Sequence, residues 1–262
     1  MGKRSGYPHG TFSFADVMTN DVDGAKSFYT EFFGWSAQTT RAGTADEYML
    51  FSMDGAPVAG TFMQPPEQRD EGISPNWVSY ITVDDVDETS RLAREVGGSV
   101  VVEPRDMADA GRMCAILDTH GAGFCIWEPR KHFGAGIVNE PGAMSWNELR
   151  SPDPRSVQDF YTRLFGWSYQ ETDMGGGLAY VGMNVGGKKN GGMIPSQVMG
   201  PDVPPHWGVY FAVVDTGEAV ERAQRIGAKV LAPPMDVPNG SFASLADPQG
   251  AAFSILAGQL DP

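Results

Sequence analysis

An internal repeat constrains the possible fold of this chain more than any other sequence feature. The nine residues FYTEFFGWS begin at Phe28 and FYTRLFGWS begins at Phe160, so seven of nine positions recur after 132 residues. The repeat continues downstream, because residues 76–104 align with residues 206–234. A spacing close to half of the 262-residue length indicates a duplicated module rather than a chance match.

The two copies divide the chain into modules of ordinary domain length. We expect the first module at residues 8–130 and the second at residues 144–258. Residues 131–143 (KHFGAGIVNEPGA) are rich in Gly and show neither a helical nor an alternating pattern, so we expect a linker there.

Local patterns predict the same order of elements in both modules. Each begins with a strand, at residues 11–18 or 144–149, and continues with a helix that ends at Gly34 or Gly166. In the second copy, Asp153 is expected to cap that helix. Three short strands follow, and the whole pattern then starts again within the module. We therefore expect an α+β chain of four βαβββ units, with the aromatic residues of the FYxxxFGW motif buried.

These features resemble the vicinal oxygen chelate superfamily, which includes glyoxalases, bleomycin-resistance proteins and extradiol dioxygenases. The resemblance rests on the four units, on FYxxxFGW closing the first helix of each half, and on a D-x-x-G turn before each last strand. It covers about residues 10–257 and is strongest to tandem-module actinobacterial members labelled hydroxylases or glyoxalase-like proteins. It implies two glyoxalase-like, cup-shaped modules, built within or across the two copies. It does not fix the chemistry, because the superfamily hosts several activities and some plain binders.

The resemblance also implies where a metal would bind. Metal-dependent members carry ligands on three strands of a cup, usually His or Gln, then His, then Glu. Carried over strand by strand, these positions fall on Phe14, Val78 and Cys125 in the first module and on Trp146, Gly208 and Ser254 in the second. None is His, Gln, Asp or Glu, and one thiolate does not make a site for a hard or borderline divalent ion. We therefore predict no metal and no other cofactor.

The four histidines are not expected to supply a metal site either. His9 lies near the N-terminus, His120 in a turn and His132 in the linker. His206 precedes a strand and is placed where it could approach the mouth of a cup, but no second ligand accompanies it.

Each cup is instead expected to hold one carboxylate among aromatic side chains. Side chains alternate along a strand, so Asp16 shares a face with Phe14, and Glu148 shares a face with Trp146. The other expected ligand-binding residues are Tyr48, Tyr80, Cys125 and Trp127 in the first cup and Tyr180, Tyr210 and Ser254 in the second. An aromatic pocket with few polar groups is typical of sites for small planar organic ligands.

Three functions are compatible with such cups. The first is metal-free binding of a hydrophobic small molecule, such as an aromatic or polyketide-like antibiotic. The second is cofactor-independent isomerase- or cyclase-type catalysis, with Asp16 or Glu148 as general base. The third, which the ligand positions disfavour, is a metal-dependent glyoxalase, dioxygenase or hydroxylase. Whether the chain is an enzyme stays open, because both carboxylates could serve the fold alone and Cys125 has no basic partner nearby in the sequence.

Charge and composition narrow the partners and the compartment. A formal net charge of −14 disfavours nucleic acid and anionic lipid. No apolar run is long enough to cross a bilayer and no signal peptide is evident, so we expect a cytoplasmic monomer or homodimer. Cys114 and Cys125 flank the turn at residues 118–121 and are expected opposite each other on a hairpin, as buried thiols.

Overall fold

The chain folds into two similar halves of strands and helices. The structure is a computed structural model that describes residues 2–41, 47–198, 203–238 and 240–258. The first half contains β1 (Phe12–Thr19), α1 (Val22–Phe33), β2 (Ser36–Arg41), β3 (Glu47–Met53), β4 (Ala56–Met63), α2 (Pro66–Asp70), β5 (Asn76–Thr82), α3 (Val86–Glu95), β6 (Ser99–Met107), β7 (Gly111–Leu117) and β8 (Gly123–Pro129). The second contains β9 (Met144–Ser151), α4 (Gln158–Phe165), β10 (Ser168–Gly175), β11 (Leu178–Val185), β12 (Lys188–Pro195), the short 3-10 helix η1 (Ser196–Val198), β13 (His206–Ala212), α5 (Thr216–Arg225), β14 (Lys229–Val237), β15 (Gly240–Ala246) and β16 (Ala252–Gly258).

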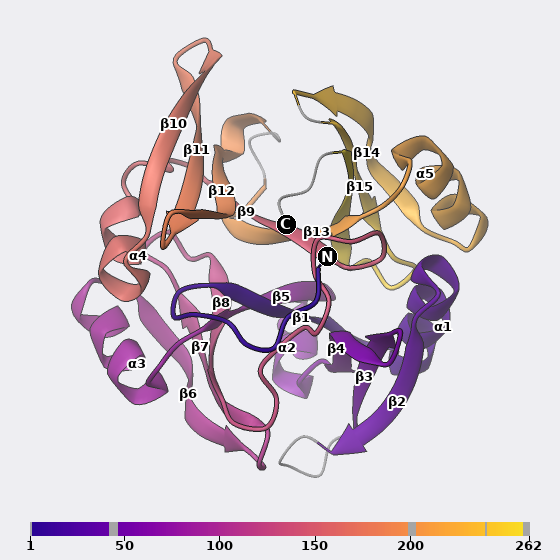
Figure 1. Cartoon of the computed structure of the whole chain (residues 1–262), viewed down its shortest axis with the longest axis horizontal. Helices are drawn as coiled ribbons and strands as arrows, with labels where there is room; N and C mark the ends of the chain where they lie inside the picture. The colour runs from indigo at the N-terminus through magenta and orange to yellow at the C-terminus, as the bar shows by residue number, and fades with distance from the viewer. Residues whose placement is uncertain (1, 42–46, 199–202, 239, 259–262) are drawn as a thin grey trace.

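Each half builds one cup from its own two βαβββ units. The strand order is β2-β3-β4-β1-β5-β8-β7-β6 in the first half and β10-β11-β12-β9-β13-β16-β15-β14 in the second. In each half the first strands of the two units, β1 with β5 and β9 with β13, pair in antiparallel fashion. We call the concave faces of these two half-sheets cup 1 and cup 2. One parallel residue pair, Ala252 with Asn76, joins them into a single 16-stranded sheet (Figure 1).

Helix α1 begins and ends where the sequence predicts, whereas α4 does not. The Asp21 carboxylate accepts a hydrogen bond from a backbone N–H of the first turn, and Gly34 ends α1 in the left-handed conformation with φ of 74°. Helix α4 begins at Gln158, so the prediction that Asp153 caps it is wrong. Asp153 instead accepts a hydrogen bond from the N–H of Arg155, two residues on, and closes a local turn.

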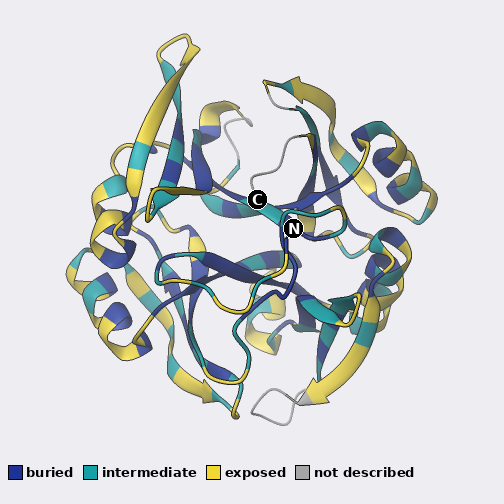
Figure 2. Ribbon diagram, in the orientation of Figure 1, coloured by how far each residue is buried: buried dark blue, intermediate teal, exposed yellow. Residues whose placement is uncertain are grey.

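The two half-sheets pack back to back through their central strands. The rings of Trp77 on β5 and Phe211 on β13 lie with centroids 4.9 Å apart, and Ser79 on β5 donates a hydrogen bond of 2.7 Å to Asn147 on β9. Figure 2 shows these central strands buried. Because side chains alternate along a strand, the intervening residues, such as Tyr80, face the opposite way into the cups. The cups therefore lie on opposite sides of the molecule.

Helices from different modules lie beside each other at both flanks. Figure 1 places α1 next to α5 and α3 next to α4. The guanidinium of Arg222 on α5 lies 5.1 Å from the ring centroid of Phe32 on α1. On the other flank, Phe124 of β8 contacts Phe160 of α4, with ring centroids 6.4 Å apart. The helices thus belong to the interface between modules as much as to their own module.

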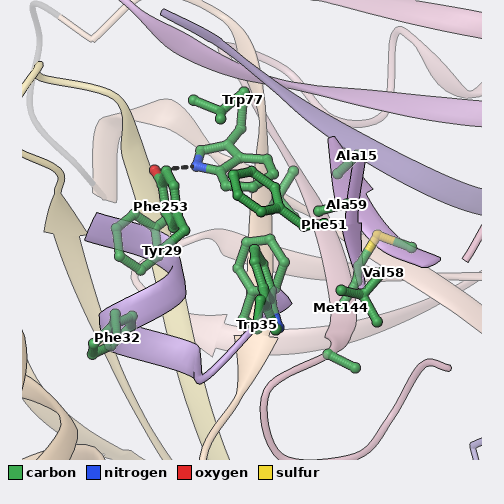
Figure 3. Close-up of a cluster of buried hydrophobic side chains, with 14 of the residues drawn as sticks. Ala15, Tyr29, Phe32, Trp35, Phe51, Val58, Ala59, Trp77, Met144 and Phe253 are labelled. Carbon is green, nitrogen blue, oxygen red and sulfur yellow. Dashed lines mark hydrogen bonds between the residues drawn. The ribbon is translucent and has the colours of Figure 1, made fainter. Parts of the chain in front are cut away.

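The tyrosine of the FYxxxFGW motif reaches across this interface. Tyr29 donates a hydrogen bond of 2.9 Å to the Asp247 carboxylate, which lies in the D-x-x-G turn of the other module. The same hydroxyl accepts a bond of 3.0 Å from the indole N–H of Trp77, and Figure 3 shows this contact within a cluster of buried aromatic rings. The prediction that the motif contributes buried aromatics is confirmed, since Phe28 and Tyr29 are both 3% exposed or less.

The second copy repeats the arrangement in the opposite direction. Tyr161 donates a bond of 2.8 Å to Asp118 in the first module and accepts one of 3.0 Å from Trp207. Each motif therefore ties its own helix to the last turn of the other module. This reciprocity gives a physical reason for the sequence similarity of the two copies at these positions.

Two further details of the first module differ from the prediction or add to it. Cys114 pairs with Ile126 in the β7–β8 ladder, and Ala115 pairs with Cys125, so the expectation of opposed cysteines is wrong by one residue. The two side chains consequently point to opposite faces, and both are buried free thiols. Residues 131–143 pack closely against the core, with Ile137 only 2% exposed. No helix among the described residues combines the length and apolar character needed to span a membrane.

Candidate functional site

Cup 1 is organised around the Asp16 carboxylate. Strand β1 turns Asp16 into the cup, where it is 4% exposed and accepts a hydrogen bond of 2.7 Å from the Tyr48 hydroxyl. Burial raises the pKa of Asp16 from 3.8 to about 6, and hydrogen bonds from Tyr48 and Tyr80 offset part of this effect. No Lys or Arg among the described residues is paired with Asp16. The carboxylate thus holds its proton more strongly than an exposed Asp does.

A glycine makes room for this hydrogen bond. Gly60 on β4 lies beside Asp16 in the ladder. A Cβ atom at position 60 would lie 1.9 Å from the Tyr48 hydroxyl and 2.4 Å from an Asp16 carboxylate oxygen. In cup 2, Gly192 stands beside Glu148 and leaves the same space for the Tyr180 hydroxyl. The two cups therefore share a carboxylate, a tyrosine and a small residue that permits their approach.

Aromatic rings and a neutral thiol form the wall of cup 1. Tyr80 contacts Phe14 and Trp127 edge-on, with ring centroids 6.4 and 6.3 Å apart. Burial, followed by the nearby Asp16 carboxylate, raises the pKa of the Cys125 thiol well above its usual range. A thiol that stays protonated is a poor nucleophile, so Cys125 contributes surface rather than reactivity.

His132 joins this wall, although the sequence placed it in the linker. Its ring meets Phe14 edge-on with centroids 4.8 Å apart, and its backbone carbonyl accepts a bond of 2.8 Å from Trp127. Burial lowers its pKa. Its Nε2 atom is buried and has no hydrogen-bond partner in the described parts of the chain. The glycine-rich segment gave no periodic signal that could have placed this side chain.

Cup 2 contains a buried ion pair rather than a lone carboxylate. Glu148 accepts a hydrogen bond of 2.7 Å from the Tyr210 hydroxyl, and Arg150 lies 3.5 Å from the same carboxylate oxygen. The Tyr210 hydroxyl also accepts a bond of 3.1 Å from Arg150. Trp146 donates a bond of 3.0 Å to Tyr180. The expected residues therefore surround Glu148, together with an arginine that was not among the expected site residues.

The remaining residues near cup 2 are polar or neutral. Ser254 lies 2.9 Å from Ser244, hydroxyl to hydroxyl, in the β15–β16 ladder. Nε2 of His206 lies 3.4 Å from Arg150, while its Nδ1 lies 2.8 Å from a backbone carbonyl oxygen. Burial lowers the pKa of His206, and the Arg150 charge lowers it further. The expectation that His206 approaches a cup agrees with this placement.

The donor set of the cups does not fit a resident divalent metal. In cup 1, Phe14, Tyr80 and Cys125 lie at one level on adjacent strands, and their only softer donor is a thiol that burial keeps protonated. His9 contacts the ring of Phe165, far from both cups in the sequence of contacts, and His120 bonds to Ser151. Within residues 2–41, 47–198, 203–238 and 240–258, no three His, Cys, Asp or Glu side chains gather as a metal site.

The two cups differ in how far their walls are exposed. Phe14, Tyr80, Cys125 and Trp127 of cup 1 are each 8% exposed or less, so a ligand reaches Asp16 only after side chains move. Trp146 and Tyr180 of cup 2 are partly exposed. A hollow of about 330 Å³ lies elsewhere, on the β10–β11 hairpin; it is lined by Arg155, Glu171, Asp173, Gly177, Leu178 and Ala179. Its charged groups are a surface ion pair, so we do not assign the site to it.

Two cups of paired βαβββ units define a tandem glyoxalase-like protein, and sequence comparison agrees. The family model of the Glyoxalase/Bleomycin resistance protein/Dioxygenase superfamily matches residues 11–126 and 137–255. The chain belongs to that superfamily, as the resemblance predicted.

Two curated relatives cover nearly the whole chain. It is 39% identical over 258 residues to "Putative glyoxylase CFP32" of Mycobacterium tuberculosis (strain CDC 1551 / Oshkosh), covering 98% of both chains. It is 33% identical over 257 residues to "Anthracycline biosynthesis protein DnrV" of Streptomyces peucetius, covering 94% of this chain and 93% of the relative.

Solved structures of the superfamily share the fold at low sequence identity. The Mn(II)-bound glyoxalase from Novosphingobium aromaticivorans superposes with a TM-score of 0.65 at 16% identity, over 99% of this chain and 84% of that one. The 2,3-dioxygenase LapB from Pseudomonas sp. KL28 gives a TM-score of 0.63 at 14% identity, over 97% and 95% of the two chains. At such identities the likeness concerns the fold alone.

Proposed function

We propose that this protein binds a small, planar aromatic or polyketide-like molecule in its cups without a metal ion. The observation that carries the proposal is the set of residues at the three strand positions where metal-dependent members of the superfamily hold their ligands. In cup 1 these are Phe14, Val78 and Cys125, and in cup 2 they are Trp146, Gly208 and Ser254. Aromatic and small side chains at these positions favour contact with a flat apolar surface.

The polar groups of the cups suit the edge of such a ligand. Asp16 in cup 1 and Glu148 in cup 2 would accept hydrogen bonds from ligand hydroxyl or amine groups. Tyr48 and Tyr180 would hold these carboxylates in place, and Tyr80 and Tyr210 would add a second phenol to each cup. Phe14, Trp127 and Trp146 would supply the flat contacts, and Cys125 and Ser254 the small surfaces between them. Few polar groups in an apolar cup fix orientation without strong chemistry.

The names of the relatives support a ligand of this class. One relative is named for anthracycline biosynthesis, and anthracyclines contain fused, flat, oxygen-rich aromatic rings. The other relative is named as a glyoxylase, which points to superfamily membership rather than to a ligand. We therefore place fused aromatic ketones and phenols first among the molecules to test.

Two measurements on the untagged protein test the proposal. Elemental analysis by mass spectrometry should give less than a stoichiometric amount of Fe, Mn, Ni and Zn. Titration with 1,8-dihydroxyanthraquinone should quench tryptophan fluorescence, because Trp127 and Trp146 lie in the cup walls. Stoichiometric metal would reject the metal-free proposal, and the search would turn to lyase or oxygen-dependent chemistry. Absence of quenching by any flat aromatic molecule would reject the binding proposal.

A second candidate function is cofactor-independent proton transfer, with Asp16 as the general base. One observation favours it, because a buried carboxylate with a pKa of about 6 is close to the value that general-base catalysis needs at neutral pH. This candidate predicts turnover of a bound molecule that Asp16→Asn abolishes while binding persists. A ligand that is recovered unchanged after long incubation would favour the binding function instead.

A further inference from the structure

Arg150 is the feature of cup 2 that the expected function leaves unused. It is 4% exposed, and strand β9 turns it into the cup beside Glu148. A guanidinium has five N–H donors and no acceptor. In the structure its Nη2 donates to the Tyr210 hydroxyl at 3.1 Å, and its Nη1 lies 3.4 Å from Nε2 of His206. Its Nε atom is buried and has no partner in the described residues.

The neighbouring carboxylate does not use this spare capacity. The shortest distance between Arg150 and Glu148 is 3.5 Å, longer than an ordinary N–H···O hydrogen bond. The Tyr210 hydroxyl stands between the two charges, accepting from Arg150 and donating to Glu148 at 2.7 Å. The guanidinium is thus held in place by its neighbours but is not saturated by them. Buried polar groups in native proteins normally have partners, so an unsaturated one in a cup needs an explanation.

The chain makes specific room for the guanidinium. A Cβ atom at Gly208 of β13 would lie only 1.9 Å from Nη1 of Arg150. The two positions that correspond to Arg150 and Gly208 in cup 1, by shifts of 132 and 130 residues, are Met18 and Val78. Cup 1 therefore has neither the cation nor the space for it. The pairing of an arginine with a glycine is a property of cup 2 alone.

We propose that Arg150 makes cup 2 the site for an electron-rich oxygen of the ligand, either a carboxylate or a conjugated carbonyl or phenolate oxygen. The unpartnered donor would complete its hydrogen bonding to that oxygen, and the buried positive charge would favour it electrostatically. Glu148, which only accepts hydrogen bonds when ionised, would take an adjacent ligand hydroxyl. The inference rests on the proposed binding function and adds that the two cups select different ligand edges.

Three flat molecules of similar ring size separate the possible sources of the oxygen. Anthraquinone-2-carboxylate carries a carboxylate, 1,8-dihydroxyanthraquinone carries carbonyl and hydroxyl oxygens, and anthracene carries none. Binding of each is measured by fluorescence quenching for the Glu148→Gln protein and for the Glu148→Gln/Arg150→Met protein. The shared Glu148→Gln background avoids leaving an unpaired buried carboxylate when the arginine is removed. Circular dichroism checks that each protein is folded.

The expected result is a loss of affinity that follows the ligand oxygen. Removal of Arg150 should weaken one or both oxygen-bearing molecules by about 10- to 100-fold, the range for hydrogen bonds to charged groups, and should change anthracene binding less than about threefold. Whichever of the two weakens more identifies the oxygen type. Gly208→Ala should weaken the same molecules while every charge remains. Arg155→Met, which removes an exposed arginine paired with Glu171, should change none of them.

Other outcomes would overturn the inference. Equal weakening of all three molecules, or weakening of none, would mean that Arg150 serves only the fold. If the wild-type protein binds none of the three, both this inference and the proposed binding function fail. If it binds them and only the Arg150 dependence is absent, the binding function stands and the inference alone fails.

Discussion

Replacement of Asp16 by Asn should make the folded protein more stable at neutral pH. Burial raises the pKa of Asp16 from 3.8 to about 6, so the ionised side chain is less favourable in the folded state than in the unfolded state. The difference corresponds to about 3 kcal/mol when the group is ionised in both states. Below pH 3.8 Asp16 is neutral in both states and the cost disappears. The cost grows as the pH rises and is complete above about pH 6.

Urea denaturation at intervals from pH 4 to pH 8, followed by tryptophan fluorescence, measures this effect. The free energy of unfolding of Asp16→Asn minus that of the wild type should increase by up to about 3 kcal/mol across this range. Any constant offset from the amide itself appears at every pH and does not affect the test. Tyr48, Tyr80 and Cys125 stay neutral throughout, because burial raises the pKa of each well above 8.

A matched control and a second variant make the test specific. Asp109 is exposed and its pKa is lowered by hydrogen bonding to Lys131, so the difference for Asp109→Asn should not rise with pH. Tyr48→Phe removes a donor that lowers the Asp16 pKa, so it should move the midpoint of the wild-type transition to higher pH. A stability difference for Asp16→Asn that is flat between pH 4 and pH 8 would refute the argument from burial.

Three further predictions concern contacts on the same two modules. Gly60→Ala should abolish ligand binding in cup 1 and cost about 1–3 kcal/mol in urea denaturation, because its Cβ would displace the Tyr48 hydroxyl from Asp16. Tyr161→Phe should cost about 1–3 kcal/mol, since it leaves a buried oxygen of Asp118 unpartnered; unchanged stability would mean that the cross-module bond is dispensable. Cys125 should not react with a thiol reagent at pH 8 in the native protein but should react fully in urea, and rapid native labelling would contradict its burial.

The sequence by itself determined the duplicated architecture and much of the content of the cups. The repeat at 132 residues and the local helix and strand patterns are properties of short stretches, so they could be read before any contact was known. Strand alternation also placed Asp16 and Glu148 on the concave faces correctly, because the two-residue period holds within each strand. The same reasoning set the cysteine pair one residue out, since the register of a hairpin depends on the geometry of its turn.

The tertiary structure decided which side chains meet across long distances in the chain. No local pattern indicated that Tyr29 bonds to Asp247 in the other module, or that His132 leaves an apparent linker to join cup 1. Arg150 was visible on the inward face of its strand, but only the open space at Gly208 shows that a guanidinium fits there. Such contacts depend on how two curled sheets pack and on the volume left at single positions. Periodicity along one strand carries no information about either.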